Sequence, residues 1–353
     1  MSRTRVVVLF GGRSVEREVS RISARTICGA LDPARYEVIP LEVGRDGRFL
    51  SAGESAKRLA AGPIPERYRT AEPSSEGLVP AEIAPGHADV VFPIIHGTTG
   101  EDGALQGFLE TLNLPYVGAG VTASALGMDK AVFKALLRDA GIPTPRAAVL
   151  RGAGELASAA LPPLPVFVKP ACGGSSVGVT KVKRAADLAP AVGLALRYDE
   201  RALVEEAIDA RELECAVLGN EEPRASIPGE IVPGHEFYDY DDKYRDDKAR
   251  LLIPAPVSPA IAEEARRLAV LVFRLCGVSG MARVDFFLER GTERVLVNEI
   301  NTLPGFTAIS MYPKLWEASG LPLPKLLDEL IRLALERREK RCRLLTEPPA
   351  QLE

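Results

Sequence analysis

Residues 283–301 read RVDFFLERGTERVLVNEIN, and this stretch predicts two strands joined by a turn. Two short, mainly apolar runs at 283–288 and 295–301 predict two strands. Gly291 lies between them and predicts the tip of a hairpin. In a hairpin centred there, positions whose numbers sum to about 584 face each other across the strand pair.

Four polar side chains gather on this expected strand pair. Because side chains alternate across a strand, Arg283 and Asp285 share one face, and Glu299 and Asn301 share one face. The hairpin places Asp285 opposite Glu299, and facing carboxylates repel each other unless a cation lies between them. Carboxylate and amide oxygens suit Mg²⁺, which is commonly held together with phosphate oxygens. The pattern therefore predicts magnesium chemistry on a nucleotide.

The composition narrows the class of protein. A chain of 353 residues is long enough for two or three domains, and its 46% hydrophobic and 26% charged residues are typical of a soluble globular protein. The net charge of −4 gives no reason to expect a nucleic-acid surface, and no apolar run approaches a membrane span. The five cysteines lack CxxC spacing, which argues against a disulfide framework or a zinc site and favours a reducing cytoplasm.

The first third of the chain alternates between strand and helix patterns. The run 6–10 predicts a strand buried on both faces, and a helix from about 20 to 31 and a strand at 36–41 complete a βαβ unit. Residues 51–85 are rich in Pro, Gly, Ser and Glu, and we interpret them as a surface insertion with at most one short helix. The later parts predict strands and helices at 89–95, 105–112, 133–140, 165–170, 202–206, 211–218, 259–276 and 323–341.

A glycine-rich loop at 173–178 connects two expected strands, and Lys169 ends the first of them. Glycines let backbone N–H groups approach a phosphate closely, and a lysine at the end of a buried strand favours an anion nearby. Lys130, on the preceding helix, is a second candidate phosphate contact, with a solvated surface lysine as the alternative. The loop matches neither the P-loop nor the GxGxxG pattern, and an ordinary hairpin is the competing interpretation.

Three more segments carry polar residues that can serve a site. The first is VEEAI at 204–208 with Glu212, where a backbone edge and acids can meet adenine and ribose; a charged surface turn is the better interpretation of Glu206. The second is the end of the first strand, where Glu16 can hold an ammonium group and His96 lies at the equivalent end of another strand. The third is the aromatic loop 235–250, which we interpret as a lid rather than a flexible surface loop.

Taken in order, these motifs resemble the D-alanine–D-alanine ligases of the ATP-grasp superfamily over nearly the whole chain. The most specific stretches are 11–20, 96–103, 169–178, 237–244, 283–287 and 298–307. The resemblance implies an N-terminal Rossmann-like parallel sheet in a substrate domain (1–119), and two domains that clasp ATP. These are a small central domain (120–205) and a C-terminal domain with the metal site and lid (206–353).

The resemblance also implies roles by position. The ATP-binding residues would be Lys130, Lys169, Gly174, Ser176, Glu205, Glu206, Ile208 and Glu212. Two Mg²⁺ ions, with Mn²⁺ as a substitute, would be held by Asp285, Glu299 and Asn301. The catalytic set would be Glu16, Ser175, Tyr244 and Arg283. The substrate-binding set would be His96, Lys243, Gly305 and Ser310.

Within these sets, Glu16 would hold the ammonium group of the first D-alanine, and Ser175 and Tyr244 would link the lid to Glu16. Arg283 would stabilise the oxyanion, a contact typically worth a few kcal/mol. The implied reaction joins two D-alanines through an acyl phosphate and serves peptidoglycan synthesis. The resemblance also implies a cytoplasmic protein that forms a homodimer.

Four alternatives remain open. A D-alanine–D-lactate ligase is disfavoured by Tyr244, because a Phe at that position is associated with D-lactate use in this family. Another ATP-grasp carboxylate–amine ligase is disfavoured by the region around Glu16 and by the lid. A non-catalytic nucleotide-binding regulator would not need all four polar residues of the 283–301 hairpin. A nicotinamide oxidoreductase is disfavoured because the first turn lacks GxGxxG.

Overall fold

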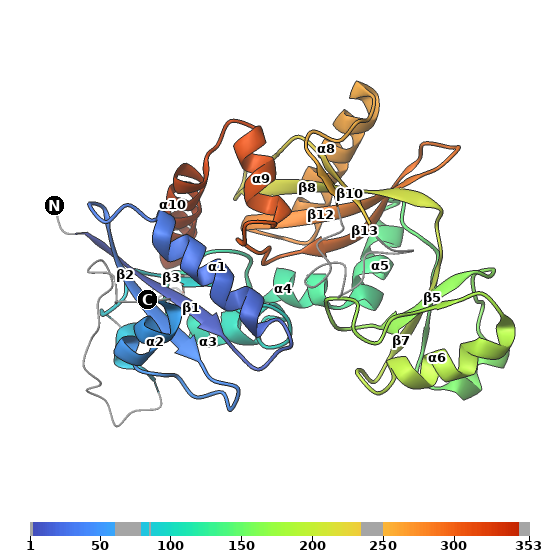
Figure 1. Cartoon of the computed structure of the whole chain (residues 1–353), viewed down its shortest axis with the longest axis horizontal. Helices are drawn as coiled ribbons and strands as arrows, with labels where there is room; N and C mark the ends of the chain where they lie inside the picture. The colour runs from blue at the N-terminus through green and yellow to red at the C-terminus, as the bar shows by residue number, and fades with distance from the viewer. Residues whose placement is uncertain (1–2, 61–78, 85, 234–249, 346–353) are drawn as a thin grey trace, which may run out of the picture.

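The computed structural model describes residues 3–60, 79–84, 86–233 and 250–345. Three sheets of three, six and four strands organise this part of the chain. Figure 1 shows the three-stranded sheet at the left, the four-stranded sheet at the lower right and the six-stranded sheet above. One sheet is parallel and the other two are antiparallel, which confirms the predicted fold class. No helix in the described ranges is long and apolar enough to cross a membrane.

The parallel sheet has the order β2-β1-β3, with β1 at Thr4–Gly11, β2 at Tyr36–Val43 and β3 at Val90–Pro93. Residues 6–10 of β1 have no exposed surface, as predicted for a central strand with apolar side chains on both faces. Helix α1 spans Arg17–Ala30 and begins three residues earlier than predicted. Its early start places Glu16 directly at the helix entrance.

The insertion expected at 51–85 is only partly described, and its first part is not a surface feature. Helix α2 (Ala52–Leu59) buries Ala52, Ala56 and Leu59 completely against the parallel sheet. Small residues at i, i+4 and i+7 form a narrow apolar stripe even in a polar segment. The expectation of a surface insertion is therefore wrong for α2, whereas residues 61–78 and 85 lie outside the described ranges.

The four-stranded sheet has the order β4-β7-β5-β6 and carries the glycine-rich loop between its last two strands. Helix α6 (Leu188–Ala195) packs on it, and its strands are β4 (Ala147–Leu150), β5 (Val166–Pro170), β6 (Thr180–Val182) and β7 (Ala202–Glu206).

The six-stranded sheet contains the predicted hairpin of residues 283–301. Its path is β11-β10-β8-β12-β13, and β9 pairs with β8. Asp285 of β12 pairs with Glu299 of β13, and Arg283 pairs with Asn301, so the predicted register is confirmed. The strands are β8 (Ala210–Gly219), β9 (Arg224–Ala225), β10 (Gly229–Val232), β11 (Arg250–Leu252), β12 (Gly280–Glu289) and β13 (Val295–Asn301).

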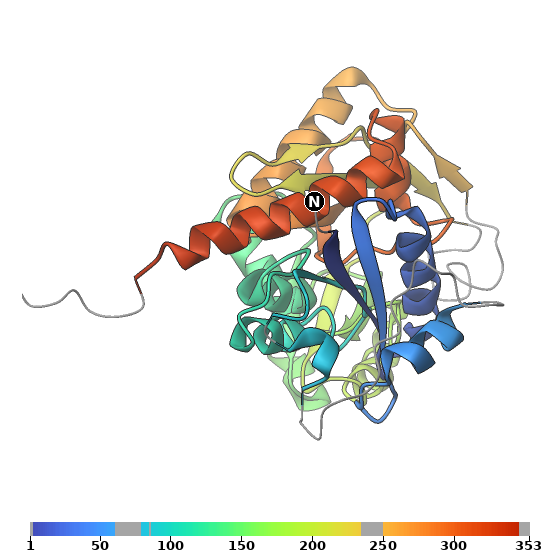
Figure 2. The same cartoon turned by 90° about the vertical axis from the view of Figure 1, so that its left-hand side faces the viewer.

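Helices join the sheets into one body. Helix α8 (Pro259–Leu275) and helix α5 (Lys130–Asp139) share the core of the six-stranded sheet. Helix α10 (Leu323–Cys342) shares the core of the parallel sheet, and Figure 2 shows it running across that end of the molecule. The other helices are α3 (Ala104–Thr111), α4 (Val121–Met128), α9 (Met311–Ala318) and the short η1 (Ala81–Ile83), η2 (Ala153–Ala157) and η3 (Ala185–Asp187).

Candidate active site

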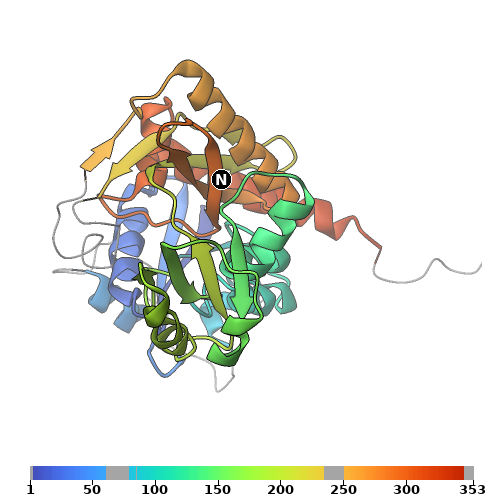
Figure 3. The same ribbon diagram turned by 90° about the vertical axis from the view of Figure 1, so that its right-hand side faces the viewer.

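A cavity of about 750 Å³ lies where the three sheets meet. Figure 3 shows the four-stranded sheet facing the six-stranded sheet across this region. Every predicted site residue in the described ranges lines the cavity: Glu16, His96, Lys130, Lys169, Gly174, Ser175, Ser176, Glu205, Glu206, Ile208, Glu212, Arg283, Asp285, Glu299, Asn301, Gly305 and Ser310. The remaining two, Lys243 and Tyr244, and the lid residues 234–249 lie outside the described ranges.

The glycine-rich loop reaches across the cavity to the N-terminal unit. The Ser175 Oγ donates to Glu16 Oε1 at 2.5 Å. Ser175 and Ser176 both have positive φ angles, 50° and 58°, which non-glycine residues adopt only where the surroundings require it. A Cβ on Gly174 would lie 3.3 Å from Glu16 Oε2, so the loop backbone passes close to this carboxylate. The loop is therefore shaped to present its backbone and hydroxyls to the cavity.

Two lysines lie at the start of the loop. The Lys130 Nζ donates to the Gly173 carbonyl at 2.6 Å, and the Lys130 backbone N–H donates to Ala171 at 2.9 Å. The Lys169 Nζ lies 2.6 Å from Glu205 Oε1. Both ammonium groups line the cavity beside the loop, which is the place predicted for a phosphate.

Glu205 is buried, and it contacts a lysine that sequence reasoning missed. The Lys134 Nζ lies 2.6 Å from Glu205 Oε2, and both side chains are 2% exposed. Lys134 stands between Phe133 and Leu137 on the buried stripe of α5. A charged residue inside an apolar helical stripe is the signal that could have identified it.

The Glu206 side chain pairs with a different residue from the two lysines that contact Glu205. It forms an ion pair with Arg146 at 2.8 Å, and Arg146 is largely exposed. The hydrogen bond from Arg146 lowers the pKa of Glu206, so the carboxylate stays ionised. The side chain thus forms an ion pair at the surface, and residues 205–208 line the cavity.

The hairpin residues form a cluster of buried charges. The Arg283 guanidinium donates to both oxygens of Asp285 at 2.7 Å and lies 3.0 Å from Glu214. Burial alone would lower the pKa of Arg283, but the charges of Asp285 and Glu214 raise it well above its usual range. Arg283 therefore stays a cation. Glu214, on the adjacent strand β8, was missed because only the sheet register brings it opposite Asp285.

The predicted metal ligands combine two carboxylates with one amide oxygen. Asp285 and Glu299 are register partners, and the Asn301 Oδ1 already accepts a hydrogen bond from the Leu303 backbone at 2.9 Å. Among the described residues, no three His, Cys, Asp or Glu side chains gather as a metal cluster would. A set this small fits Mg²⁺, which takes one or two carboxylates and completes its octahedron with phosphate oxygens and water.

The N-terminal side of the cavity holds a buried histidine. The His96 Nδ1 lies 3.1 Å from Glu101 Oε1, and its Nε2 lies 3.5 Å from Ser23 Oγ. Burial lowers the pKa of His96, but the hydrogen bond and charge of Glu101 outweigh it and raise the pKa. Burial, reinforced by the charge of Glu16, raises the pKa of Glu101 as well. The pair therefore retains a proton to a higher pH than an ordinary histidine would.

Ser23 ties this histidine to the loop that follows β13. Its Oγ accepts a hydrogen bond from the Phe306 backbone at 3.1 Å. A Cβ on Gly305 would lie 2.9 Å from Ser310 Oγ and 3.8 Å from His96 Nε2, so any larger residue would require the Ser310 hydroxyl to move. Ser23 was not predicted because nothing in helix α1 distinguishes it from the other serines.

Comparisons with known proteins agree over nearly the whole chain. Residues 5–119 match the family described as D-ala D-ala ligase N-terminus, and residues 136–332 match D-ala D-ala ligase C-terminus. The D-alanine–D-alanine ligase A of Chromobacterium violaceum is 49% identical, with 96% of each chain covered. The D-alanine–D-alanine ligase of Thermoanaerobacter sp. (strain X514) is 46% identical, over 97% of this chain and 99% of its own.

Solved structures show the same likeness. The D-alanine–D-alanine ligase of Coxiella burnetii superposes with a TM-score of 0.82 at 39% identity, and 97% of each chain is covered. The VanG D-Ala:D-Ser ligase of Enterococcus faecalis gives a TM-score of 0.78 at 31% identity, over 94% of this chain and 100% of its own.

Proposed function

The chain belongs to the D-alanine–D-alanine ligase family, and from that premise we propose that it joins two D-alanine molecules in an ATP-dependent reaction. The observation that carries the proposal is the 2.5 Å hydrogen bond from Ser175 to Glu16. This bond joins a loop suited to phosphate with a carboxylate suited to an ammonium group. A site that activates one amino acid with ATP needs both features side by side.

Activation of the first D-alanine is the step that needs ATP, because a free carboxylate is a poor acylating agent. One carboxylate oxygen attacks the γ-phosphorus of ATP, the bond to the bridging oxygen breaks, and ADP leaves. Phosphoryl transfer depends on positioning and charge neutralisation more than on covalent help. In the proposed site Lys130, Lys169 and the loop amides bind the phosphates, and Glu16 holds the ammonium group.

The hairpin residues serve this step and the next. Asp285, Glu299 and Asn301 would hold Mg²⁺, which when bound neutralises charge on the phosphate oxygens. Arg283 remains a cation beside Asp285 and Glu214, and in the later peptide-forming step it would offer N–H groups to the oxyanion that develops when the amine adds to the acyl carbon. The fixed planar fork of a guanidinium suits this task better than a flexible ammonium.

The second step forms the peptide bond. The amine of the second D-alanine attacks the acyl carbon, the C–N bond forms, the C–O bond to phosphate breaks, and the nitrogen gives up a proton. Ser310 and Gly305 line the end of the cavity next to His96, where this second molecule would bind. Exclusion of water matters here because the acyl phosphate hydrolyses readily.

An assay of ADP release tests the proposal. The purified chain with Mg²⁺ and ATP should release ADP when D-alanine is added and should not when L-alanine is added. Equal release with both enantiomers would overturn the D-alanine assignment. D-Lactate and D-serine as second substrates, each supplied with a limiting amount of D-alanine, separate the peptide ligase from the depsipeptide and D-serine ligases by the mass of the product.

Finer features of the function are also proposals. Omitting Mg²⁺ should abolish ADP release, and Mn²⁺ should restore it. Light scattering on the purified chain should give twice the chain mass of 37.9 kDa if the protein is a homodimer. Cytoplasmic location follows from the availability of ATP, and fractionation of cells that express a tagged chain checks it. The domain boundaries after residues 119 and 205 can be checked by limited proteolysis.

A further inference from the structure

Three ionisable side chains from three elements meet below the glycine-rich loop. Glu205 of β7 holds Lys169 of β5 on one carboxylate oxygen and Lys134 of α5 on the other, each at 2.6 Å. Lys134 and Glu205 are 2% exposed, whereas Lys169 is 13% exposed and lines the cavity. In this charged row of Lys169, Glu205 and Lys134, the first two residues line the cavity and Lys134 does not.

Lys134 is held in position by neutral partners as well. Its Nζ donates to Thr144 Oγ1 at 3.2 Å, and the Thr144 hydroxyl donates to the Val297 carbonyl at 2.8 Å. Val297 lies on β13, one residue before Asn298 and two before Glu299. The row thus connects the hairpin of the six-stranded sheet, through α5, to the centre of the four-stranded sheet.

The charges of the row do not cancel. Two ammonium groups and one carboxylate leave a net charge of +1, and the surplus lies at the exposed end, on Lys169. Without Lys134, the carboxylate of Glu205 would neutralise Lys169 completely. A lysine whose charge is already matched by a buried carboxylate 2.6 Å away has little attraction left for a phosphate.

We propose that Lys134 is a positioning residue for nucleotide binding: it serves as the counter-ion of Glu205 and so leaves the charge of Lys169 available to a phosphate of ATP. The inference rests on the proposed function for the contact between Lys169 and ATP. Lys134 touches no substrate itself, because it is buried beneath Glu205.

Burial lowers the pKa of Lys134, and the charge and hydrogen bond of Glu205 act in the opposite direction. Burial raises the pKa of Glu205, but the charges and hydrogen bonds of the two lysines outweigh it and lower the pKa, so the carboxylate is ionised. A buried lysine is costly unless it faces a negative charge, and an apolar residue of similar volume is often as stable at such a position. A methionine would fill the same stripe of α5, so packing alone does not require a lysine there.

A double-mutant cycle tests the proposal through binding of MgATP without D-alanine, measured by calorimetry. Lys134→Met should raise the Kd about tenfold or more, which corresponds to about 1.4 kcal/mol. On a Glu205→Gln background, the same substitution should change the Kd by less than about threefold, because no buried carboxylate then competes for Lys169. Lys134→Arg keeps the charge and should stay close to the parent protein. Lys183→Met removes an exposed positive charge from the same sheet and is the matched control.

The outcomes separate the two hypotheses. If Lys134→Met weakens MgATP binding equally on both backgrounds, Lys134 acts by packing and the inference is wrong. If Lys134→Met does not fold, Glu205→Gln and the double variant still decide, since neither strands a buried carboxylate and the amide oxygen that Glu205→Gln introduces and Thr144 Oγ1 still accept from Lys134 in the single variant. A large difference in Kd between these two variants overturns the inference. Lys169→Met tests the underlying assignment: an unchanged Kd would overturn the role of Lys169 in ATP binding, and the inference with it.

Discussion

Charged side chains in the cavity tolerate burial because each faces an opposite charge. Arg283 faces Asp285 and Glu214, and Glu205 faces two lysines. Removing one partner of a buried pair strands the other, at a cost of about 3–5 kcal/mol. Substitutions at these residues therefore change folding and binding together. Positions whose role is steric or whose partner stays satisfied give cleaner tests.

Gly305 is such a steric position. Gly305→Ala should raise the KM for D-alanine about 10- to 100-fold, because the new Cβ would lie 2.9 Å from Ser310 Oγ and displace it. The KM for ATP should change little. Steady-state ADP release with each substrate varied in turn measures both constants, and an unchanged KM for D-alanine would remove Ser310 and Gly305 from the substrate site.

The matched control for this substitution is Gly193→Ala. Gly193 lies within α6, and a Cβ there would meet nothing within 4 Å. Alanine favours the helix by about 0.5–1 kcal/mol over glycine, so this variant should be slightly more stable and kinetically unchanged.

The pKa of His96 depends on its buried neighbour. Glu101→Gln removes the charge that raises the pKa and leaves only a neutral amide oxygen as acceptor, while burial, which lowers the pKa, remains. The pKa of His96 should therefore fall, and the imidazolium should lose its proton at a lower pH. An NMR titration follows this directly, because the sequence has three histidines and His96→Ala identifies the signal. A pKa that stays the same or rises would show that Glu101 does not control this proton.

Sequence reasoning found the residues that stand in ordered motifs and missed those defined only by contacts. Ser175 and Glu16 are 159 positions apart, yet both were predicted because each belongs to a recognisable segment. Lys134, Glu214 and Ser23 occupy ordinary helix and strand positions. Their importance arises from what tertiary packing places opposite them, and only Lys134, a charge within an apolar helical stripe, carries a local signal.

At the scale of elements, strong periodicity determined which predictions succeeded. Strand β1 and the hairpin of β12 and β13 have long apolar runs or a marked turn, and both lie where predicted. Helix α2 has mostly small residues and a single leucine on its buried face, so the sequence allowed a short helix there but did not predict its burial. Strand β4 and helix α4, four and eight residues long, were not predicted, because each gains its stability from neighbouring elements.

Helix α5 begins at the cap residue Asp129, which forms an isolated bridge with Cys172 just before the glycine-rich loop. The Asp129 carboxylate accepts from the backbone N–H groups of Ala131 and Val132, and its other oxygen lies 2.6 Å from Arg201. Asp129→Ala should lower the free energy of unfolding by about 2–4 kcal/mol, since it removes the cap and leaves Arg201 without this partner. Urea denaturation measures the loss.

A second variant at Asp129 and a control at the cap of α8 separate the contribution of the charge from that of the cap hydrogen bonds. Asp129→Asn keeps an oxygen acceptor but removes the charge, so it should lose less than Asp129→Ala. Ser258→Ala removes a single cap bond of 3.4 Å at the start of α8 and should cost about 1 kcal/mol or less. A loss for Asp129→Ala no larger than that for Ser258→Ala would mean that the ion pair with Arg201 contributes nothing.

In the molecule as a whole, the last helix, α10, packs against the parallel sheet formed by the first part of the chain. The buried face of α10 shares one core with residues of β1 and β3, more than 200 positions earlier in the chain. The sequence indicates that α10 is a helix but contains no signal for which sheet it covers. The predicted C-terminal domain, residues 206–353, includes α10, although α10 packs in the same core as the parallel sheet of the N-terminal unit.

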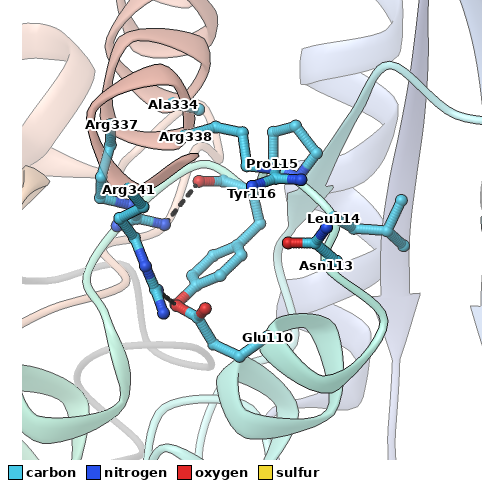
Figure 4. Close-up of a pocket in the computed structure, with 9 residues that line it drawn as sticks. All are labelled: Glu110, Asn113, Leu114, Pro115, Tyr116, Ala334, Arg337, Arg338 and Arg341. Atoms are coloured by element: carbon cyan, nitrogen blue, oxygen red, sulfur yellow. Dashed lines mark hydrogen bonds and ion pairs between the residues drawn. The ribbon is translucent and has the colours of Figure 1, made fainter. Parts of the chain in front are cut away.

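Arg337 fastens this helix to the segment that leaves the N-terminal unit. Its guanidinium donates to the carbonyl of Tyr116 at 3.0 Å (Figure 4). It also donates to the carbonyl of Gly118 and lies over the Tyr116 ring, 4.2 Å from the ring centroid. A Cβ on Gly280 of β12 would lie 3.1 Å from the Gly118 backbone nitrogen, so the six-stranded sheet meets the same segment. The Arg337 side chain thus contacts the segment at which the parallel sheet, the six-stranded sheet and α10 meet.

Arg337→Met should therefore destabilise the whole molecule, by about 2–4 kcal/mol, because two largely buried carbonyls lose their donor and the ring loses a cation. Arg338→Met is the matched control: the next arginine along α10 donates to Cys342 of the same helix, and its loss should cost less than about 0.5 kcal/mol. Urea denaturation compares the two. Because the parallel sheet and α10 share one core, the loss should appear as a lower midpoint of a single transition. Equal midpoints for the two variants would show that α10 is held by its apolar face alone, and a separate early transition would show that α10 detaches before the sheets unfold.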